Sequence, residues 1–266
     1  MREIEKSKTP ERLPKKFVET MVKDDNTRRI FNDVFDGATI AAVHELARKK
    51  YFDAVEFVVS TGKEGNVFRC KGGKNYYALK IYKIETSDFN RMQEYIIGDE
   101  RFKNVRKGKL ETVIAWTKKE FKNLTEFKKA GIRTPNPIIF KRNCLLMEFI
   151  GSEGEAAPTA KEKPFAEPEK QYEKMCEYLA KMIEAKLVHA DLSEYNILND
   201  DEEMVIIDAG QAVSTLHPKA KEFFERDIRN LSKWFAKKGV ATDFEKMYEK
   251  IKAKTKEKKE TQKTSK

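Results

Sequence analysis

Two aspartates and one asparagine in the second half of the chain have the residue types and the spacing to do chemistry. Asp191 and Asn196 lie five positions apart, and Asp208 follows soon after. Each aspartate comes at or near the end of a short apolar run, and a polar segment at 199–203 separates the two runs. This pattern predicts a β-hairpin-like pair, with Asp191 and Asn196 on the loop before it and Asp208 just after it. Three oxygen-bearing side chains that meet at one point would suit magnesium carrying phosphates.

The same spacing is typical of protein kinases. In the catalytic loop H-R-D-x-x-x-x-N the Asp orients the nucleophile and the Asn holds metal, while a second metal-binding Asp begins D-F-G. Asp191 and Asn196 match the loop, and Asp208 followed by Ala209 and Gly210 matches the second motif. Taken singly, each residue is better explained by a structural role: Asp191 as the cap of a turn, Asn196 as the cap of a strand and Asp208 as the start of a turn. The three together favour phosphoryl transfer, provided that the chain has an ATP-binding half upstream.

A glycine-bearing loop between two predicted strands could supply that half. A strand at 54–59 leads into the loop, and a further strand is expected at 76–82. Gly62 and Gly65 would let backbone amides approach phosphates closely. Two glycines alone are weak support, and the loop matches neither a Walker A motif nor the three-glycine loop of ordinary kinases.

Lys80 is the residue of this region that carries a charge within an apolar strand. It follows Ala78 and Leu79, as the lysine of the kinase V-A-I-K strand does. Its anionic partners would be the ATP phosphates and a glutamate, for which Glu120 on a helix at 113–130 is the candidate. The alternatives are an edge-strand lysine that points to water, and a solvated Glu120, since Glu126 lies on the same helix.

Further along the chain, composition and periodicity divide it into segments. A buried strand from Cys144 to Gly151 resembles the kinase hinge, and a Gly-, Pro- and Ala-containing stretch at 151–168 indicates a lobe boundary. Apolar periodicity predicts helices at 169–186 and 219–238, the second of which carries Asp227 as a brace for the catalytic loop. The predicted division is an N-terminal helical extension at 1–50, an N-lobe at 51–150 with a flexible insert at 84–111, a C-lobe at 151–249 and a basic disordered tail at 250–266.

Composition limits the class of protein. The chain has 266 residues, of which 37% are charged, and its mean hydropathy is −0.71. Three widely spaced cysteines suggest neither a disulfide framework nor a zinc site. We find neither an apolar run long enough for a membrane span nor a signal peptide, so we expect a soluble, cytoplasmic protein without a membrane partner.

The net charge of +10 is concentrated in two places. Residues 101–129 hold ten Lys or Arg and three Glu, and residues 250–266 hold eight Lys and two Glu. Such segments favour a phosphate-rich partner such as RNA. A solvated surface is the alternative, and for the tail the two interpretations are evenly matched.

Four stretches of the chain resemble the RIO family of atypical kinases. They are Ser60-Thr61-Gly62-Lys63-Glu64, Ala78-Leu79-Lys80-Ile81-Tyr82, Leu187-Val188-His189-Ala190-Asp191-Leu192-Ser193-Glu194-Tyr195-Asn196 and Ile206-Ile207-Asp208-Ala209-Gly210-Gln211. The resemblance covers about residues 35–238. The chain resembles the first RIO subfamily in having no N-terminal winged helix, and its short C-terminus resembles that of the archaeal members. Gly65 departs from the family, which commonly has a small non-glycine residue there.

The resemblance implies an α+β, bilobal, protein-kinase-like fold. Its N-lobe is an antiparallel sheet plus helices and its C-lobe is mainly helical, without the activation loop and peptide-binding helices; no A-P-E follows Gly210. It implies ATP with Mg²⁺ or Mn²⁺ as cofactors. Asp191 would be the catalytic base, Asn196 and Asp208 the metal ligands, and Asp208 the site of an aspartyl-phosphate intermediate. The nucleotide contacts would be Ser60, Thr61, Gly62, Lys63, Glu64, Val67, Lys80, Glu120, Met147, Asn196, and the backbone of Glu148 and Ile150.

The function expected from this resemblance is that of an ATP- and magnesium-dependent serine/threonine kinase and ATPase in maturation of the small ribosomal subunit. Its partners would be the pre-small-subunit particle and its rRNA, and we expect a monomer. Two alternatives remain. One is an ATP-gated binding factor on the pre-ribosome, in which hydrolysis only times release. The other is a small-molecule phosphotransferase, which the Ser60–Glu64 loop disfavours.

Overall fold

The computed structural model describes residues 22, 24–34, 36–85, 88–102, 105 and 108–264. The chain forms two compact units, of which the first comprises 1–87 and 139–147 and the second 88–138 and 148–266. One junction, between residues 147 and 148, lies near the predicted boundary at 150, whereas the segment 88–138, which the prediction placed in the N-lobe, groups with the second unit.

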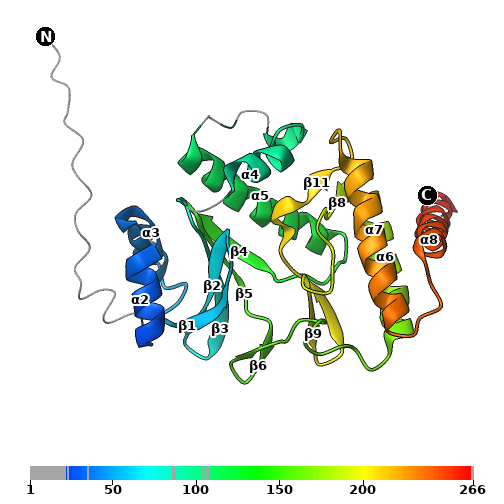
Figure 1. Ribbon diagram of the computed structural model, residues 1–266. Coiled ribbons are helices and arrows are strands. Elements are labelled where there is room, and N and C mark those ends of the chain that lie inside the picture. Colours follow the sequence, from blue (N-terminus) through cyan, green and yellow to red (C-terminus); the bar gives the residue numbers. More distant parts are fainter. Residues whose placement is uncertain are drawn as a thin grey trace, which may run out of the picture. The chain divides into compact units, whose positions relative to one another are not determined.

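A five-stranded sheet in the order β1-β2-β3-β5-β4 dominates the first unit (Figure 1). Alternate residues of β2 are buried, namely Asn66, Phe68 and Cys70, as expected of a strand with one face on a core. β1 pairs with β2 and β2 with β3, both antiparallel, which confirms the strands expected at 54–59 and 76–82. The strand bounds are β1 (Ala54–Thr61), β2 (Gly65–Gly72), β3 (Asn75–Tyr82), β4 (Pro137–Lys141) and β5 (Cys144–Glu148).

Two helices, α2 (Asp25–Val34) and α3 (Gly37–Arg48), lie beside the β1 side of the sheet (Figure 1). Asp36 caps α3, because its carboxylate accepts a 2.8 Å hydrogen bond from the Thr39 N–H, an N-terminal donor that has no partner within the helix. The apolar stripe of α3 is buried, through Ala42, Val43 and Leu46 among others.

The helical prediction for residues 1–50 holds for these two helices but not at its start. Val22 forms an isolated parallel bridge with Val55 of β1, so the helical spacing assigned to it was wrong. Phe17 and Met21, on which that spacing also rested, lie outside the described residues.

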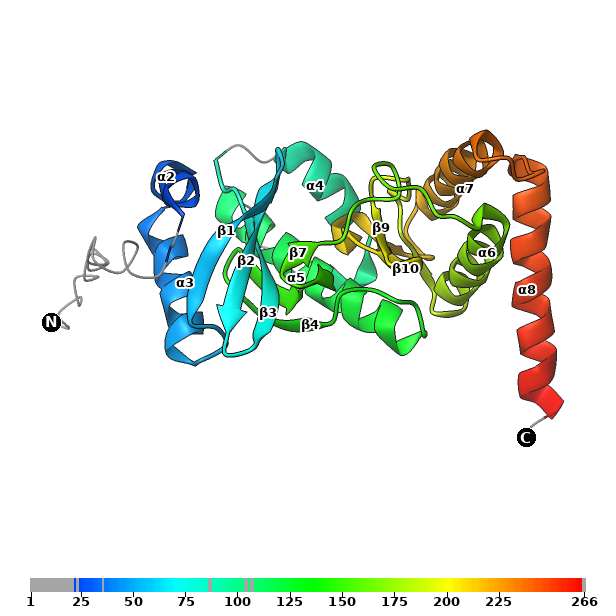
Figure 2. The ribbon, with the colours of Figure 1, turned by 90° about the horizontal axis from the view of Figure 1, so that it is seen from below.

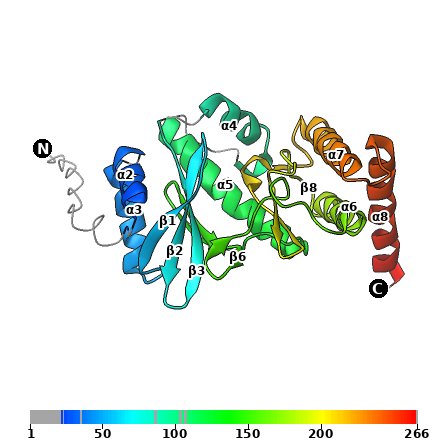
Figure 3. The same ribbon diagram turned by 60° about the horizontal axis from the view of Figure 1, so that its bottom comes forward.

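The second unit begins with α4 (Phe89–Ile96), the short 3-10 helix η1 (Glu100–Phe102) and α5 (Lys109–Lys129). α4 lies against α5 (Figure 3). The sequence indicated an irregular insert at 84–111, but the structure has the helix α4 within it. Asp88 caps the N-terminus of α4, and Met92, Tyr95 and Ile96 form its buried apolar face. The apolar residues of this eight-residue helix are too few, among the polar residues around them, to give a recognisable helical period in the sequence.

Three long helices and two small hairpins complete the second unit. The helices are α6 (Pro168–Glu184), α7 (Ala220–Lys237) and α8 (Phe244–Thr264), and α8 packs against both others (Figure 2). The antiparallel pairs are β9 (Ile197–Asp200) with β10 (Glu203–Ile206), and β8 (Leu187–Val188) with β11 (Val213–Ser214). A further pair, β6 (Gly151–Ser152) with β7 (Glu155–Ala156), follows β5, and the 3-10 helix η2 (Ala209–Gln211) lies between β10 and β11.

Two other sequence-based expectations concern the tail and the cysteines. α8 continues to Thr264, so the segment 250–264 is helical instead of irregular; Ile251 is buried, and Lys250 and Lys254 both pair with Glu173 of α6. Cys70, Cys144 and Cys176 are free thiols in the structure, and all three are buried. Among the helices that the structure describes, none combines the length and apolar character of a transmembrane segment.

Candidate active site

Asp191 lies on the loop between β8 and β9, where two side-chain amides hold it. Gln211 Nε2 donates to Asp191 Oδ2 at 2.8 Å. Asn196 Nδ2 donates to the backbone oxygen of Asp191 at 2.8 Å and to Oδ2 at 3.3 Å. Burial is the largest influence on this carboxyl and raises its pKa, and the negative charge of Asp208 raises it further. Asp191 and Asp208 are therefore electrostatic neighbours, as the sequence predicted.

Asp208 follows β10 and begins η2 with a left-handed backbone, φ 58° and ψ 58°. Aspartate is one of the few residues that tolerate this conformation. Two hydrogen bonds join Ile207, the residue before Asp208, to the loop that carries Asp191. Ile207 N–H donates to Asn196 O at 3.0 Å, and Ile207 O lies 3.1 Å from His189 Nε2. The predicted arrangement, with Asp191 and Asn196 before the β9–β10 hairpin and Asp208 after it, is confirmed.

The loop at Asp191 is anchored from behind by Asp227 of α7. Its two carboxylate oxygens accept hydrogen bonds from Ala190 N–H at 2.8 Å and Leu192 N–H at 2.9 Å, so they hold the peptides on both sides of Asp191. Arg226 donates to Ala190 O, and Ala190 itself has φ 68°. Burial raises the pKa of Asp227 to about 7, against the opposing effect of the two N–H donors. The brace expected from the sequence is present.

The donor chemistry of this loop pair fits a hard divalent cation. The Asn196 amide nitrogen is turned to Asp191, which leaves its oxygen for a cation, and the side chain of Asp208 is exposed. In the described part of the chain, no group of three or more His, Cys, Asp or Glu side chains is arranged around a metal position. A cation at Asn196 and Asp208 would therefore take further oxygens from nucleotide phosphates or water.

The predicted phosphate loop of the first unit is a tight turn between β1 and β2. Gly62 N–H donates to Gly65 O at 2.9 Å, and Lys83 Nζ donates to Gly62 O at 2.8 Å. A Cβ on Gly65 would lie 2.6 Å from Ile81 O, so this glycine is required by the neighbouring strand. The remaining predicted contacts of the loop, Ser60, Thr61, Lys63 and Glu64, lie in or beside this turn, and all but the half-buried Glu64 are exposed.

Lys80 lies on β3 between the fully buried Leu79 and Ile81 and opposite Val67 of β2. Since β3 is the middle strand of the five, the edge-strand alternative is wrong. Its ammonium lies 5.0 Å from the ring centroid of Tyr82.

Glu120 is 1% exposed on α5, so the alternative of a solvated glutamate is also wrong, whereas Glu126 is exposed and pairs with Lys129 at 2.8 Å. Lys80 belongs to the first unit and Glu120 to the second. Their pairing therefore stays a prediction.

The predicted adenine contacts lie at the end of β5. Glu148 N–H donates to Asn136 O, and Ile150 O accepts from Ala157 N–H. Adenine binding by the backbone of Glu148 and Ile150 stays a prediction. The Glu148 side chain forms a bidentate pair with Arg133 at 2.8 Å; burial raises its pKa, but the Arg133 hydrogen bonds outweigh this and lower it. Met147, the third predicted residue here, is half-buried at the edge of the first unit.

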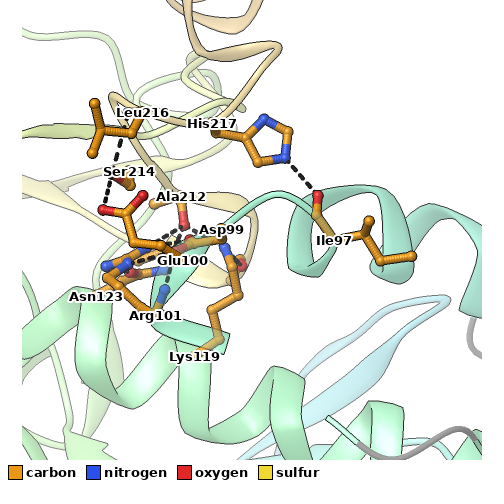
Figure 4. A network of polar contacts seen from close by, with 12 residues as sticks. Ile97, Asp99, Glu100, Arg101, Lys119, Asn123, Ala212, Ser214, Leu216 and His217 are labelled. Carbon is orange, nitrogen blue, oxygen red and sulfur yellow. Dashed lines mark hydrogen bonds and ion pairs between the residues drawn. The ribbon is translucent and has the colours of Figure 1, made fainter. Parts of the chain in front are cut away.

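Three residues beside the site had no role in the sequence-based prediction. Gln211 contacts Asp191, and Lys119 and Asn123 of α5 contact the backbone of residues 209–212 (Figure 4). Lys119 and Asn123 lie three and seven positions after the buried Trp116, so both fall on the inward face of α5. Polar residues at core positions were the signal that could have identified them.

Comparisons with known proteins show the family of this chain. Residues 66–250 match the model of the RIO domain family. The RIO-type serine/threonine-protein kinase Rio1 of Haloferax volcanii is 43% identical over 86% of this chain and 79% of its own length, and that of Thermoplasma acidophilum is 40% identical over 71% and 100%.

The fold has solved relatives as well. The structure of the Rio2 kinase-ADP/Mg²⁺-phosphoaspartate complex from Chaetomium thermophilum superimposes with a TM-score of 0.60 and 19% identity, covering 86% of this chain and 78% of the other. This likeness establishes the protein-kinase-like RIO fold that the sequence predicted. The chain belongs to the RIO family and is a RIO1-type serine/threonine-protein kinase.

Proposed function

We propose that the chain transfers the γ-phosphoryl group of ATP with Asp191 as catalytic base and with Asn196 and Asp208 as ligands of a magnesium ion. The ion would neutralise charge on the phosphates. Lys80 and Glu120 would position the phosphates, and the backbone of Glu148 and Ile150 would bind adenine. The observation that supports this most directly is the electrostatic proximity of Asp191 and Asp208, with the Asp191 carboxylate oriented by Asn196 and Gln211.

In the ATPase form of the reaction, Asp208 attacks the γ-phosphorus. An O–P bond forms at its carboxylate, the bond from the γ-phosphorus to the bridging oxygen breaks, and ADP leaves with that electron pair. A water molecule then attacks the phosphoaspartate while Asp191 accepts its proton, which releases phosphate and regenerates Asp208. The Rio2 structure is a complex with ADP, Mg²⁺ and phosphoaspartate, and this supports the same chemistry here.

The test compares Asp191→Asn with Asp208→Asn under single-turnover conditions with labelled ATP. We expect Asp191→Asn to accumulate protein-bound phosphate that survives mild acid and is released by hydroxylamine, and Asp208→Asn to show none. Phosphate resistant to hydroxylamine would mark Ser or Thr and is measured separately. Thr86 and Ser87, two candidates for such labelling, lie outside the described residues, and Thr112 is a third. Without hydroxylamine-sensitive phosphate in Asp191→Asn, the direct kinase reaction would be preferred.

For the biological role, we propose a part in small-subunit maturation through contact with pre-ribosomal RNA. The high basic content of 101–129 and 250–266 supports this. Part of that charge is already neutralised or buried, because Lys250 and Lys254 pair with Glu173 and Lys119 is fully buried. The RNA-binding charge would therefore reside in the basic insert at 101–109 and in the other lysines of 250–266.

Salt dependence distinguishes RNA binding from a solvated surface. Replacing Lys103, Arg106, Lys107 and Lys109 with Gln should reduce the slope of log K against log salt by about 0.7 to 0.9 for each RNA phosphate that these side chains neutralise. An unchanged slope and affinity would favour the solvated surface. If ATP hydrolysis releases bound pre-small-subunit particles and no Ser or Thr becomes phosphorylated, the ATP-gated binding factor would be the better description.

A further inference from the structure

The inward face of α5 carries a lysine and an asparagine where apolar side chains are expected. Lys119 and Asn123 are both 0% exposed, on the same face as Trp116 and Phe127. Burying an ammonium group is unfavourable unless its hydrogen bonds to water are replaced by hydrogen bonds within the protein. Burial accordingly lowers the pKa of Lys119 well below its usual range. A role for these two residues should be sought in what they contact.

Their contacts are backbone oxygens of the segment that follows Asp208. Lys119 Nζ donates to Gly210 O at 3.0 Å and also to Ala212 O. Asn123 Nδ2 donates to Ala209 O and to Ala212 O, both at 2.8 Å. Every carbonyl but that of residue 211 in this four-residue segment is therefore bound from α5.

Two residues of the segment before α5 complete the cluster (Figure 4). Arg101 donates to Asn123 Oδ1 at 2.9 Å and to Ala212 O at 3.3 Å, so Ala212 O faces three donor side chains. The buried Asp99 accepts from Arg101 at 2.6 and 2.8 Å and places a negative charge beside the two cations. We call Asp99, Arg101, Lys119 and Asn123 the α5 clamp.

The segment held by the α5 clamp reaches both candidate catalytic carboxylates. Asp208 immediately precedes Ala209, whose carbonyl oxygen is the first that the α5 clamp binds. Gln211 lies between the clamped residues Gly210 and Ala212, and its amide donates to Asp191 at 2.8 Å. Holding the backbone of residues 209–212 in place therefore restrains the position of Asp208, which is bonded to Ala209. It also restrains Gln211, the hydrogen-bond donor to Asp191.

We propose that Lys119 and Asn123 are positioning residues of the phosphoryl-transfer reaction, which hold residues 209–212 so that Asp208 and Asp191 keep their reactive geometry. An apolar side chain in place of either would avoid the cost of burying a polar group. Without Lys119, however, Gly210 O would lose its donor, and without Asn123, Ala209 O would lose its side-chain donor; either change would remove one of the three donors to Ala212 O. The proposal rests on the roles proposed above for Asp191 and Asp208.

The test compares Lys119→Met with Lys118→Met, a neighbouring and exposed lysine of the same helix. Both variants replace an amine with a side chain of similar length, but only Lys119→Met removes donors from Gly210 O and Ala212 O. We expect kcat for ATP turnover to fall on the order of 100-fold in Lys119→Met, with a much smaller change in KM for ATP, because misplacement rather than weaker binding limits the reaction. Lys118→Met should match the unchanged chain.

Asn123→Leu provides a second, independent variant, and chemical denaturation of each variant reports on folding. A kcat of Lys119→Met equal to that of Lys118→Met would overturn the proposal, as would a rise in KM with kcat preserved. If Lys119→Met does not fold, the kcat of Asn123→Leu decides in the same way. Failure of both to fold would show a purely structural cluster and would also overturn it.

The roles of the carboxylates are checked in parallel. If Asp191→Asn and Asp208→Asn keep full turnover, the proposed site fails whatever the clamp variants do. If both lose turnover and Lys119→Met does not, only the clamp proposal fails.

Discussion

Replacing Asp227 tests whether the loop at Asp191 is held by the hydrogen bonds from α7. Asp227→Ala leaves two buried N–H groups, those of Ala190 and Leu192, without their acceptors at 2.8 and 2.9 Å. Each unpaired buried donor costs about 1–3 kcal/mol, so the loss of folding free energy should be about 2–6 kcal/mol at pH 5. Asp227→Asn keeps one acceptor oxygen and should lose about half as much.

The pH dependence of this deficit has a definite sign. Burial raises the pKa of Asp227 from 3.8 to about 7 in the folded chain. Between pH 4 and 7 the unfolded chain has lost this proton and the folded chain keeps it, so the contribution of Asp227 to stability falls as pH rises. The wild-type advantage over either variant should therefore shrink by about 1.4 kcal/mol per pH unit between pH 5 and 7.

Denaturant unfolding of the three chains at several pH values measures both effects. The difference in unfolding free energy between wild type and Asp227→Asn isolates the titration, because all other groups are shared. A difference that stays constant or grows from pH 5 to 7 would refute the assigned burial effect. Equal stability of wild type and Asp227→Ala at pH 5 would refute the brace itself.

Three further predictions concern the nucleotide, the metal and Gly210. Lys80→Ala should keep its unfolding midpoint but lower kcat/KM for ATP by roughly 100-fold or more, because it removes a charge that clamps phosphates; unchanged turnover would exclude Lys80 from the site. ATP affinity by calorimetry should need a divalent cation and favour Mg²⁺ or Mn²⁺ over Zn²⁺, since the proposed ligands are oxygens, and equal affinity in EDTA would contradict the role of Asn196 and Asp208. Gly210→Ala should destabilise the chain by about 1–3 kcal/mol, because its Cβ would lie 2.8 Å from Trp116 Nε1; Trp116→Phe should recover part of this loss, and independence of the two changes would show that the contact is not the cause.

The local arrangement of the candidate carboxylates could be predicted because it depends on short-range patterns. A polar turn between two apolar runs specified the β9–β10 hairpin, and the positions of Asp191, Asn196 and Asp208 around it followed. The identity of the bracing residue Asp227 could be inferred too, as a carboxylate on the apolar face of a helix.

What the sequence did not predict depends on contacts between distant segments. The clamp joins residues 99–101, 119–123 and 209–212, and periodicity along one helix says nothing about which loop covers its inward face. The same limit explains the tail: α8 is held by burial of Met247 and Ile251 and by ion pairs to α6, whereas its own composition, rich in lysine, favoured an irregular segment.

The motif Asp208-Ala209-Gly210-Gln211 can now be understood one residue at a time. Asp208 has a left-handed backbone conformation, which aspartate tolerates. Position 210 requires glycine because a Cβ there would lie too close to Trp116. Gln211 orients Asp191. Ala209, at the place where other kinases have a phenylalanine whose packing distinguishes active from inactive states, offers only a buried methyl group. Side-chain packing at this position can therefore contribute little to the placement of the loop, whose carbonyl oxygens instead accept hydrogen bonds from Lys119 and Asn123 of α5.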